Sequence, residues 1–115
     1  MEDAHIIESL TALAHPTRLK VFRLLVAAGP SGLPSGEIAR RVAVPATTMS
    51  SHLAVLARAG LVDSARLSRV ISYRLAPARV QALLAALVAD CCDGRPELCA
   101  PLIGPPPMVA AHHPA

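Results

Sequence analysis

The stretch that decides the fold is residues 35–60, SGEIARRVAVPATTMSSHLAVLARAG. Ser35 is a favourable N-cap for a short helix over residues 36–42, because its hydroxyl can accept a hydrogen bond from the first turn. Pro45 then marks a turn, and Gly60 is a natural end for a second helix. Two short helices joined by a tight turn predict a helix-turn-helix arrangement.

The second of these helices has an apolar face and a small, polar face. Met49, Leu53 and Leu56 fall together at helical spacing and are expected in the core. The opposite face would let the helix enter the major groove of DNA, where hydroxyls reach base edges or phosphates. The alternative is that the polar side chains of this face only cap the helix and interact with solvent. The predicted DNA-binding residues of this helix are Thr47, Thr48, Ser50, Ser51, His52 and Arg58.

His52 differs from the rest of this set, because it falls beside the apolar face of the helix. We expect it to pack or to contact phosphate rather than to read bases. Downstream, residues 61–66 and 70–75 alternate like β-strands, and residues 67–69 would join them as a hairpin. Arg66 and Arg69 would then flank the minor groove as part of a wing, and both are predicted to contact DNA.

Three further helices are predicted, over residues 3–14, from Pro16 to about residue 28, and from Pro77 onward. The fold class is therefore mainly α with a small β-hairpin, a winged helix-turn-helix. The first and last helices carry apolar stripes that so small a domain cannot bury, which predicts a homodimer through Leu10, Leu13, Leu84 and Leu87. The predicted buried side of the helix that starts at Pro16 consists of Leu19, Phe22, Leu25 and Val26.

Length and charge narrow the class of protein. A chain of 115 residues suits one domain, which we place at residues 1–100, followed by a Pro-rich tail, predicted disordered, at residues 101–115. Residues 15–79 hold ten Lys and Arg against two acidic residues, a net charge of +8, whereas the rest holds one Arg against six acidic residues, or −5. A basic middle favours a polyanionic partner there, although charge alone fits an ordinary solvated surface equally well.

The sequence also predicts where the protein resides. No segment reaches the ~18 apolar residues of a membrane helix, so no membrane contact is expected. The first residues, Met-Glu-Asp-Ala-His, are acidic and do not fit a signal peptide, which predicts a cytoplasmic protein with reduced thiols. The odd number of cysteines, three, argues against a closed disulfide framework.

Several motifs together resemble one known family. Leu13-Ala-His-Pro-Thr-Arg-Leu19, Glu37-Ile-Ala39, Pro45-Ala-Thr-Thr-Met-Ser-Ser-His-Leu53 and Ala59-Gly-Leu-Val62 look like segments of the ArsR/SmtB metalloregulatory repressors. The resemblance covers about residues 5–100. It implies a winged-helix homodimer, built on its first and last helices, that binds palindromic operator DNA and releases it when metal binds. Pro45-Ala46 replaces the common Ser-Gln, as in one arsenic-type branch of the family.

The cysteines decide which inducer this resemblance favours. Residues 33–38 contain no Cys-x-Cys and residues 77–90 contain no His, so two of the family's metal sites are absent. The remaining set resembles the arsenite-responsive branch, and the implied metal ligands are Cys91, Cys92 and Cys99. Three soft thiolates suit As(III) or Sb(III) better than the four-ligand tetrahedron of zinc, while Cd(II) and Pb(II) stay open. No constitutive cofactor is expected.

Geometry sets a condition on this site. Adjacent side chains on an intact helix point about 100° apart, so Cys91 and Cys92 could share one ion only at a frayed helix end. A bend at Gly94 and Pro96 would then return Cys99 to the pair. Taken alone, Cys91 is also explained as a small core residue that continues the apolar stripe.

Three other classes of protein compete with a metalloid-responsive repressor. A thiol redox sensor on the same fold is the main alternative, because vicinal cysteines can be oxidised. An enzyme is not expected: a phosphatase-like arsenate reductase needs Cys-x5-Arg, but Glu97 and Leu98 stand six residues after Cys91 and Cys92. A third alternative, a metal-buffering protein, would not explain the polar helix face or the wing.

Overall fold

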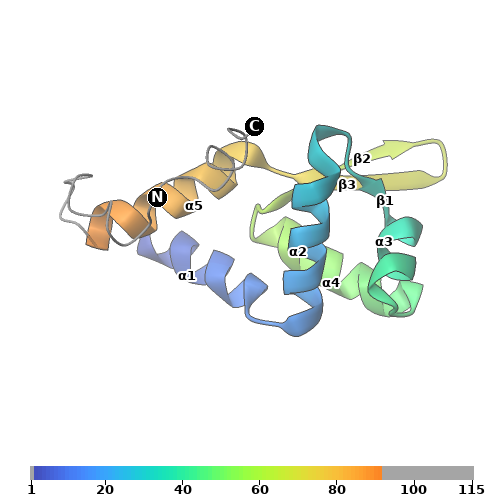
Figure 1. Ribbon diagram of the computed structural model, residues 1–115, viewed down its shortest axis with the longest axis horizontal. Helices are drawn as coiled ribbons and strands as arrows, with labels where there is room; N and C mark the ends of the chain where they lie inside the picture. Colours follow the sequence, from blue (N-terminus) through green and yellow to red (C-terminus); the bar gives the residue numbers. More distant parts are fainter. Residues whose placement is uncertain (1, 92–115) are drawn as a thin grey trace, which may run out of the picture. The chain divides into compact units, whose positions relative to one another are not determined.

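The computed structural model describes residues 2–91, and its five α-helices and the hairpin follow one another as the sequence predicts (Figure 1). The predictions for Cys92, Cys99 and the tail at 101–115 lie outside the described residues. The fold is a winged helix-turn-helix, mainly α with an antiparallel hairpin, as expected. Its elements are α1 (Asp3–Leu13), α2 (Pro16–Ala28), the 3₁₀ turn η1 (Gly29–Ser31), β1 (Leu33–Pro34), α3 (Ser35–Val42), α4 (Ala46–Arg58), β2 (Val62–Leu67), β3 (Val70–Leu75) and α5 (Pro77–Cys91).

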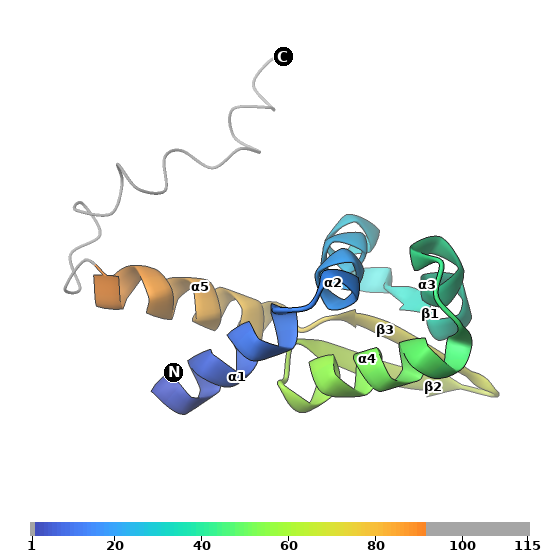
Figure 2. The same cartoon turned by 90° about the horizontal axis from the view of Figure 1, so that it is seen from below.

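The core is aliphatic, as a chain with 2% aromatic residues requires. Helices α2, α3 and α4 pack on one another, and α4 also packs against β2 (Figure 2). The predicted burial of Leu19 and Val26 on α2 is wrong, since these side chains are 37% and 57% exposed. The register of α2 is rotated from the expected one, because packing against α1, α3 and α4 selects another face. The side chains that fill the core are Ile6, Ala12, Val21, Leu25, Ile38, Ala39, Met49, Leu53, Leu56, Ala59, Leu61, Val62 and Leu83.

The sheet has three strands in the order β1-β3-β2, all antiparallel. The hairpin pairs Val62 with Leu75 at its base and Leu67 with Val70 at its tip. The composition of residues 29–34 predicts only a loop, but Leu33–Pro34 forms β1 and pairs with β3. Gly32 permits this approach: its φ is +65°, and a Cβ there would lie 2.2 Å from the Tyr73 carbonyl oxygen.

The turn between α3 and α4 closes without glycine. Ala43 adopts the left-handed conformation, with φ 65° and ψ 47°. Its N–H donates to the Arg40 carbonyl and the Val44 N–H donates to the Ala39 carbonyl, the two hydrogen bonds of a Schellman motif. The prediction of Ser35 as N-cap is wrong: Pro34 holds that position and Ser35 is the first helical residue.

The chain divides into two compact units, Met1–Leu83 and Leu84–Ala115. The first unit contains the whole helix-turn-helix and the three-stranded sheet. The division falls inside α5, whose Leu83 belongs to the core of the first unit. Among residues 2–91, no helix is both long and apolar enough to cross a membrane.

Candidate nucleic-acid interface

Helix α4 presents the two faces that its sequence predicts. Met49, Leu53 and Leu56 are fully buried, with 0% exposure. These three side chains hold the helix against the core of the first unit. The polar side chains predicted to contact DNA are exposed to solvent on the same helix, and they are Thr47, Thr48, Ser50, Ser51 and Arg58.

The first turn of α4 is open toward solvent. Its N-cap is Pro45, whose side chain makes no capping hydrogen bond. The first backbone N–H groups of a helix have no partner within the helix and carry a partial positive charge. Thr47 and Thr48 add two exposed hydroxyls to this turn. The end of the helix therefore offers donors of the kind that phosphate and base edges accept.

His52 is anchored rather than free. Arg18 of α2 donates from Nε to the Ala12 carbonyl at 2.6 Å, and its Nη1 lies 3.2 Å from Nδ1 of His52. Because a guanidinium only donates, Nδ1 of His52 must accept, which assigns the proton to Nε2. The ring of His15 lies against His52 with centroids 4.6 Å apart. These contacts agree with the packing role expected for His52, and a phosphate contact stays a prediction.

This environment lowers the pKa of His52. Burial of the ring is the largest cause, and electrostatic interactions with His15 and Arg18 add to it. His52 is therefore held neutral near pH 7, as its acceptor role requires. Sequence reasoning assigned no role to Arg18, although it lies within one of the motifs that carry the family resemblance; nothing local reveals that its side chain reaches α4.

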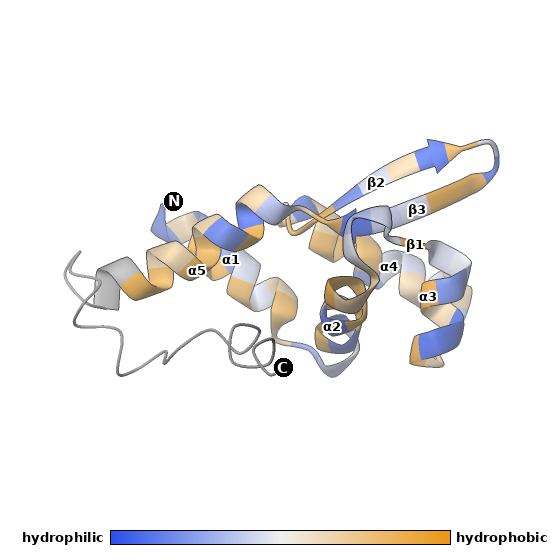
Figure 3. Ribbon diagram, turned by 45° about the horizontal axis from the view of Figure 1, so that its top comes forward, coloured by the Kyte–Doolittle hydropathy of each residue, from blue (hydrophilic) through white to orange (hydrophobic). Residues whose placement is uncertain are grey.

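The hairpin forms the predicted wing. Its tip projects beyond α3 and α4 of the same unit (Figure 3). Arg66 lies at the end of β2 and Arg69 lies in the turn, and both are exposed. Ser68, the first residue of the turn, has a φ of +60°. The structure thus brings α4 and the wing together in one unit, and it leaves both predicted arginines available to a ligand.

Two arginines of helix α3 interact with one glutamate of the same helix. The Glu37 carboxylate accepts a hydrogen bond from Nε of Arg41 at 2.6 Å and pairs with Arg40 as well. The hydrogen bond from Arg41 is the main reason that the pKa of Glu37 is lowered. Both arginines remain largely exposed, at 71% and 53% of their side chains. In a helix-turn-helix domain this helix crosses the DNA backbone, where such charges favour phosphate.

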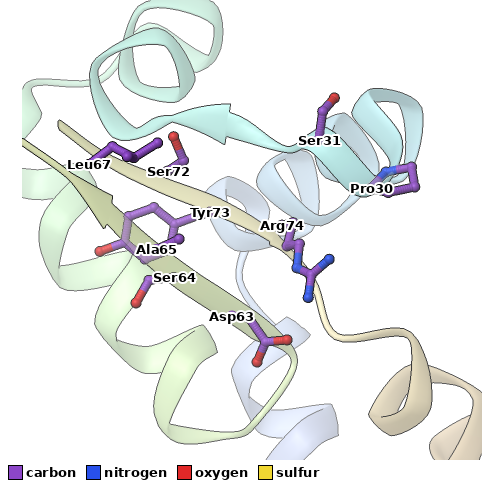
Figure 4. A pocket seen from close by; sticks show the side chains of 9 residues that line it. All are labelled: Pro30, Ser31, Asp63, Ser64, Ala65, Leu67, Ser72, Tyr73 and Arg74. Atoms are coloured by element: carbon purple, nitrogen blue, oxygen red, sulfur yellow. The ribbon is translucent and has the colours of Figure 1, made fainter.

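A hollow on the first unit lies over β2, β3 and η1 (Figure 4). Asp63 and Arg74, which are register partners on the two strands, both line it. Among the residues that line the hollow there is no histidine or cysteine, so it lacks the usual general base and the usual thiol nucleophile. Its other lining residues are Pro30, Ser31, Ser64, Ala65, Leu67, Ser72 and Tyr73.

The predicted thiol site cannot be assembled from the described residues. Cys91 is the last residue of α5, and its side chain is outside the described set, as are Cys92 and Cys99. Within the described part of the chain, no group of three or more His, Cys, Asp or Glu residues is placed to hold a metal ion. The thiol site therefore stays a prediction.

Known proteins share this architecture. A helix-turn-helix domain family matches residues 13–65. The HTH-type transcriptional regulator YgaV of Escherichia coli is 36% identical over 78 residues, which cover 68% of this chain and 77% of the relative. The biofilm growth-associated repressor of Agrobacterium fabrum is 37% identical over 83 residues, which cover 72% of this chain and 68% of the relative.

Solved structures agree with these relatives. A possible transcriptional regulator for arsenical resistance superposes with a TM-score of 0.61 at 32% identity, over 70% of this chain and 80% of the other. A homodimeric winged helix-turn-helix DNA-binding domain from Mycobacterium bovis, a possible ArsR-family regulator, superposes with a TM-score of 0.62 at 28% identity. The superposition covers 78% of this chain and 88% of the other.

The fold, the polar face of α4 and the basic wing define the class of protein, a winged helix-turn-helix transcriptional regulator. The chain belongs to the ArsR-type family of these regulators.

Proposed function

We propose that this protein is a homodimeric transcriptional repressor that binds double-stranded operator DNA through α4 and the wing. The observation that carries the proposal is the exposed polar face of α4, held rigidly by a fully buried apolar face, in the same unit as an exposed basic hairpin. The net charge of +8 over residues 15–79 supports a polyanionic partner for this unit. The name of the Agrobacterium fabrum relative supports repression as the sign of regulation.

We further propose that As(III) or Sb(III) is the inducer and that Cys91, Cys92 and Cys99 are its ligands. Arsenite, As(OH)3, would exchange its three hydroxyls for the sulfurs of three cysteine thiols, and each hydroxyl would leave as water with the proton of one thiol. The support is chemical: soft thiolates select thiophilic ions, and three cysteines within nine residues offer the three sulfurs of a pyramidal site. The similarity to a possible regulator for arsenical resistance points the same way.

The switch works through α5. Cys91 ends this helix, and Leu84 and Leu87, on the expected dimer stripe, are 58% and 40% exposed in the single chain. An ion held at the end of α5 would act on the helix that sets the spacing of the two recognition helices. By linkage, an ion that prefers the state unable to bind DNA must lower DNA affinity, typically by roughly 1–3 kcal/mol of coupling.

The test is a release titration on the promoter region beside the protein's own gene. Arsenite, antimonite, Cd(II), Zn(II) and peroxide are added separately to the preformed complex, with fluorescence anisotropy of the labelled duplex as readout. Arsenite and antimonite should release the wild-type protein. The triple variant Cys91→Ser, Cys92→Ser, Cys99→Ser should bind the same DNA and stay bound. Release of this variant at the wild-type arsenite concentration would contradict the mechanism.

The second candidate is a thiol redox sensor that uses the same cysteines. Two thiols would be oxidised to a disulfide while peroxide is reduced to water. The adjacent thiols of Cys91 and Cys92 favour it, since such thiols are readily oxidised. Release by peroxide but not by arsenite identifies this function, whereas release by Cd(II) alone identifies a cadmium-type sensor.

A further inference from the structure

The tip of the wing carries an apolar pair that the fold does not use. Leu67 is 75% exposed, more than any other large apolar side chain in residues 2–88. Val70 stands directly opposite it in the hairpin register and is 48% exposed. The core lies at the other end of the hairpin, around the buried Val62. Leu67 therefore contributes little to folding and remains available to a partner.

The surroundings of this pair are cationic. Arg66 precedes Leu67 and Arg69 precedes Val70, and both are exposed. Within residues 2–91, neither guanidinium makes a hydrogen bond or an ion pair with the rest of the chain. The acidic residue of the hairpin, Asp63, lies near its base opposite Arg74. An apolar tip between two free arginines matches a polyanion that also offers apolar surface.

The minor groove of duplex DNA is such a partner. Its walls are phosphates, and its floor and the gaps between base pairs accept apolar side chains, which proteins use to unstack base steps and bend the duplex. One side chain at the tip of a two-residue turn can reach into a groove about 6 Å wide while the strands stay outside it. The tip and the N-terminal end of α4 lie toward the same end of the first unit (Figures 1 and 2), so one duplex can meet both.

We propose that Leu67, backed by Val70 and flanked by Arg66 and Arg69, enters the minor groove beside each half-site and wedges a base step there, bending the operator. The inference rests on the proposed DNA-binding function. It gives the wing a role in specificity without hydrogen bonds to bases: pyrimidine–purine steps, which unstack easily, should be preferred where the wing lies.

The experiment uses the full chain and a duplex that the wild-type protein selects from a randomised pool. The bend is measured by energy transfer between dyes at the two ends, and affinity is measured across a series of salt concentrations. Leu67→Ser should reduce the bend and weaken binding roughly ten-fold, the loss expected from one apolar side chain. The slope of affinity against salt should stay unchanged, because every phosphate contact is kept.

Matched variants separate a wedge from a general effect of exposed apolar surface. Leu67→Met, which keeps an apolar side chain, should retain the bend and the affinity. Val26→Ser changes an exposed apolar residue on α2, 57% exposed, and should change neither. Arg66→Ala should instead flatten the salt slope, by about 1 for each phosphate that Arg66 neutralises.

Three results would overturn the proposal. In the first, Leu67→Ser binds and bends the duplex as the wild type does. In the second, Leu67→Ser changes the oligomeric state but not the bend, which would make the tip a contact between copies of the chain. In the third, the pool yields no duplex that the wild-type protein binds. The proposed DNA-binding function would then be wrong, and so would the role of Leu67 that depends on it. A folded Leu67→Ser variant, checked by its melting curve, makes the first two results decisive.

Discussion

Ala43 and Gly60 occupy equivalent positions at the ends of two successive helices. Each has a positive φ, 65° and 80°, and each is followed by the backbone hydrogen bond from residue i to i−5 that defines a Schellman motif, at Val44 and Leu61. Glycine adopts this left-handed conformation without steric strain, whereas a residue with a Cβ is destabilised there by roughly 1–2 kcal/mol. Ala43, in the turn that orients α4, therefore lowers the stability of the folded protein.

We expect Ala43→Gly to stabilise the protein. Removing the Cβ relieves the left-handed strain, and part of this gain is offset by the greater freedom of glycine in the unfolded chain, leaving about 0.5–1 kcal/mol. The measurement is the free energy of unfolding from urea denaturation. Ala82→Gly, in the middle of α5, is the control and should destabilise by a similar amount. A loss of stability in Ala43→Gly would contradict the strain at this position.

His52 gives stability a dependence on pH with a defined sign. Its pKa in the folded protein is lowered by burial and by His15 and Arg18. The unfolded chain, with the usual histidine pKa of about 6.5, therefore binds the proton first as pH falls. The free energy of unfolding should fall as pH drops below that value and should level off below the pKa of the folded state.

The check is a comparison with His52→Gln, whose amide oxygen can still accept from Arg18. Unfolding of both proteins is followed on either side of the histidine pKa. The variant should lose less stability on acidification than the wild type does. Equal losses in the two proteins would show that His52 does not carry the pH dependence.

At the scale of elements, the proposed function gives α4 and the hairpin different contributions to DNA binding. The exposed side of α4 presents small hydroxyls, which discriminate bases at close range. The hairpin presents arginines, whose charge acts on any phosphate backbone. The two elements should therefore be separable by measuring sequence preference and salt dependence independently.

We expect the double variant Thr47→Ala, Ser51→Ala to lose discrimination between operator and unrelated DNA while it keeps its salt slope. The double variant Arg66→Ala, Arg69→Ala should weaken binding to every sequence and should flatten the slope by about 1 per phosphate contact. Competition binding over a range of salt concentrations measures both effects. If the hydroxyl variant still prefers the operator to the wild-type extent, α4 does not read it through these residues.

At the scale of the whole molecule, the first and last helices of a single chain, α1 and α5, leave large apolar side chains uncovered. Ile7 and Leu10 of α1 are 63% and 42% exposed, and Leu84 and Leu87 of α5 are 58% and 40% exposed. Burying one such side chain is worth about 1.5–3 kcal/mol, which a symmetric dimer gains twice. In such a dimer the two copies of α4 would face half-sites about 34 Å apart, related by the two-fold axis.

Leu84→Asp should convert the protein to a monomer with much weaker operator binding, because a carboxylate would be buried at the interface. Ala82→Asp, about 200° away around α5, is the matched control and should remain dimeric. Analytical ultracentrifugation at micromolar concentration distinguishes the two. A wild-type chain that sediments as a monomer at that concentration would rule out the dimer.

The sequence by itself determined the features that depend on near neighbours. Pro16 begins α2, the apolar spacing of Met49, Leu53 and Leu56 sets the buried face of α4, and alternation defines the hairpin. The polar face and the two wing arginines of the candidate site follow from the same local rules. Periodicity and turn chemistry act within a few residues, so they can be read without the fold.

Only the tertiary structure decided the features that join distant residues. Leu33 pairs with Tyr73, Arg18 bridges Ala12 and His52, and α2 buries Val21 where the spacing favours other positions. Each of these contacts depends on how whole elements pack, and no local pattern encodes that. The anchoring of His52 is the clearest case: the sequence places it beside the core, but the hydrogen bond that fixes its ring comes from a guanidinium 34 residues away.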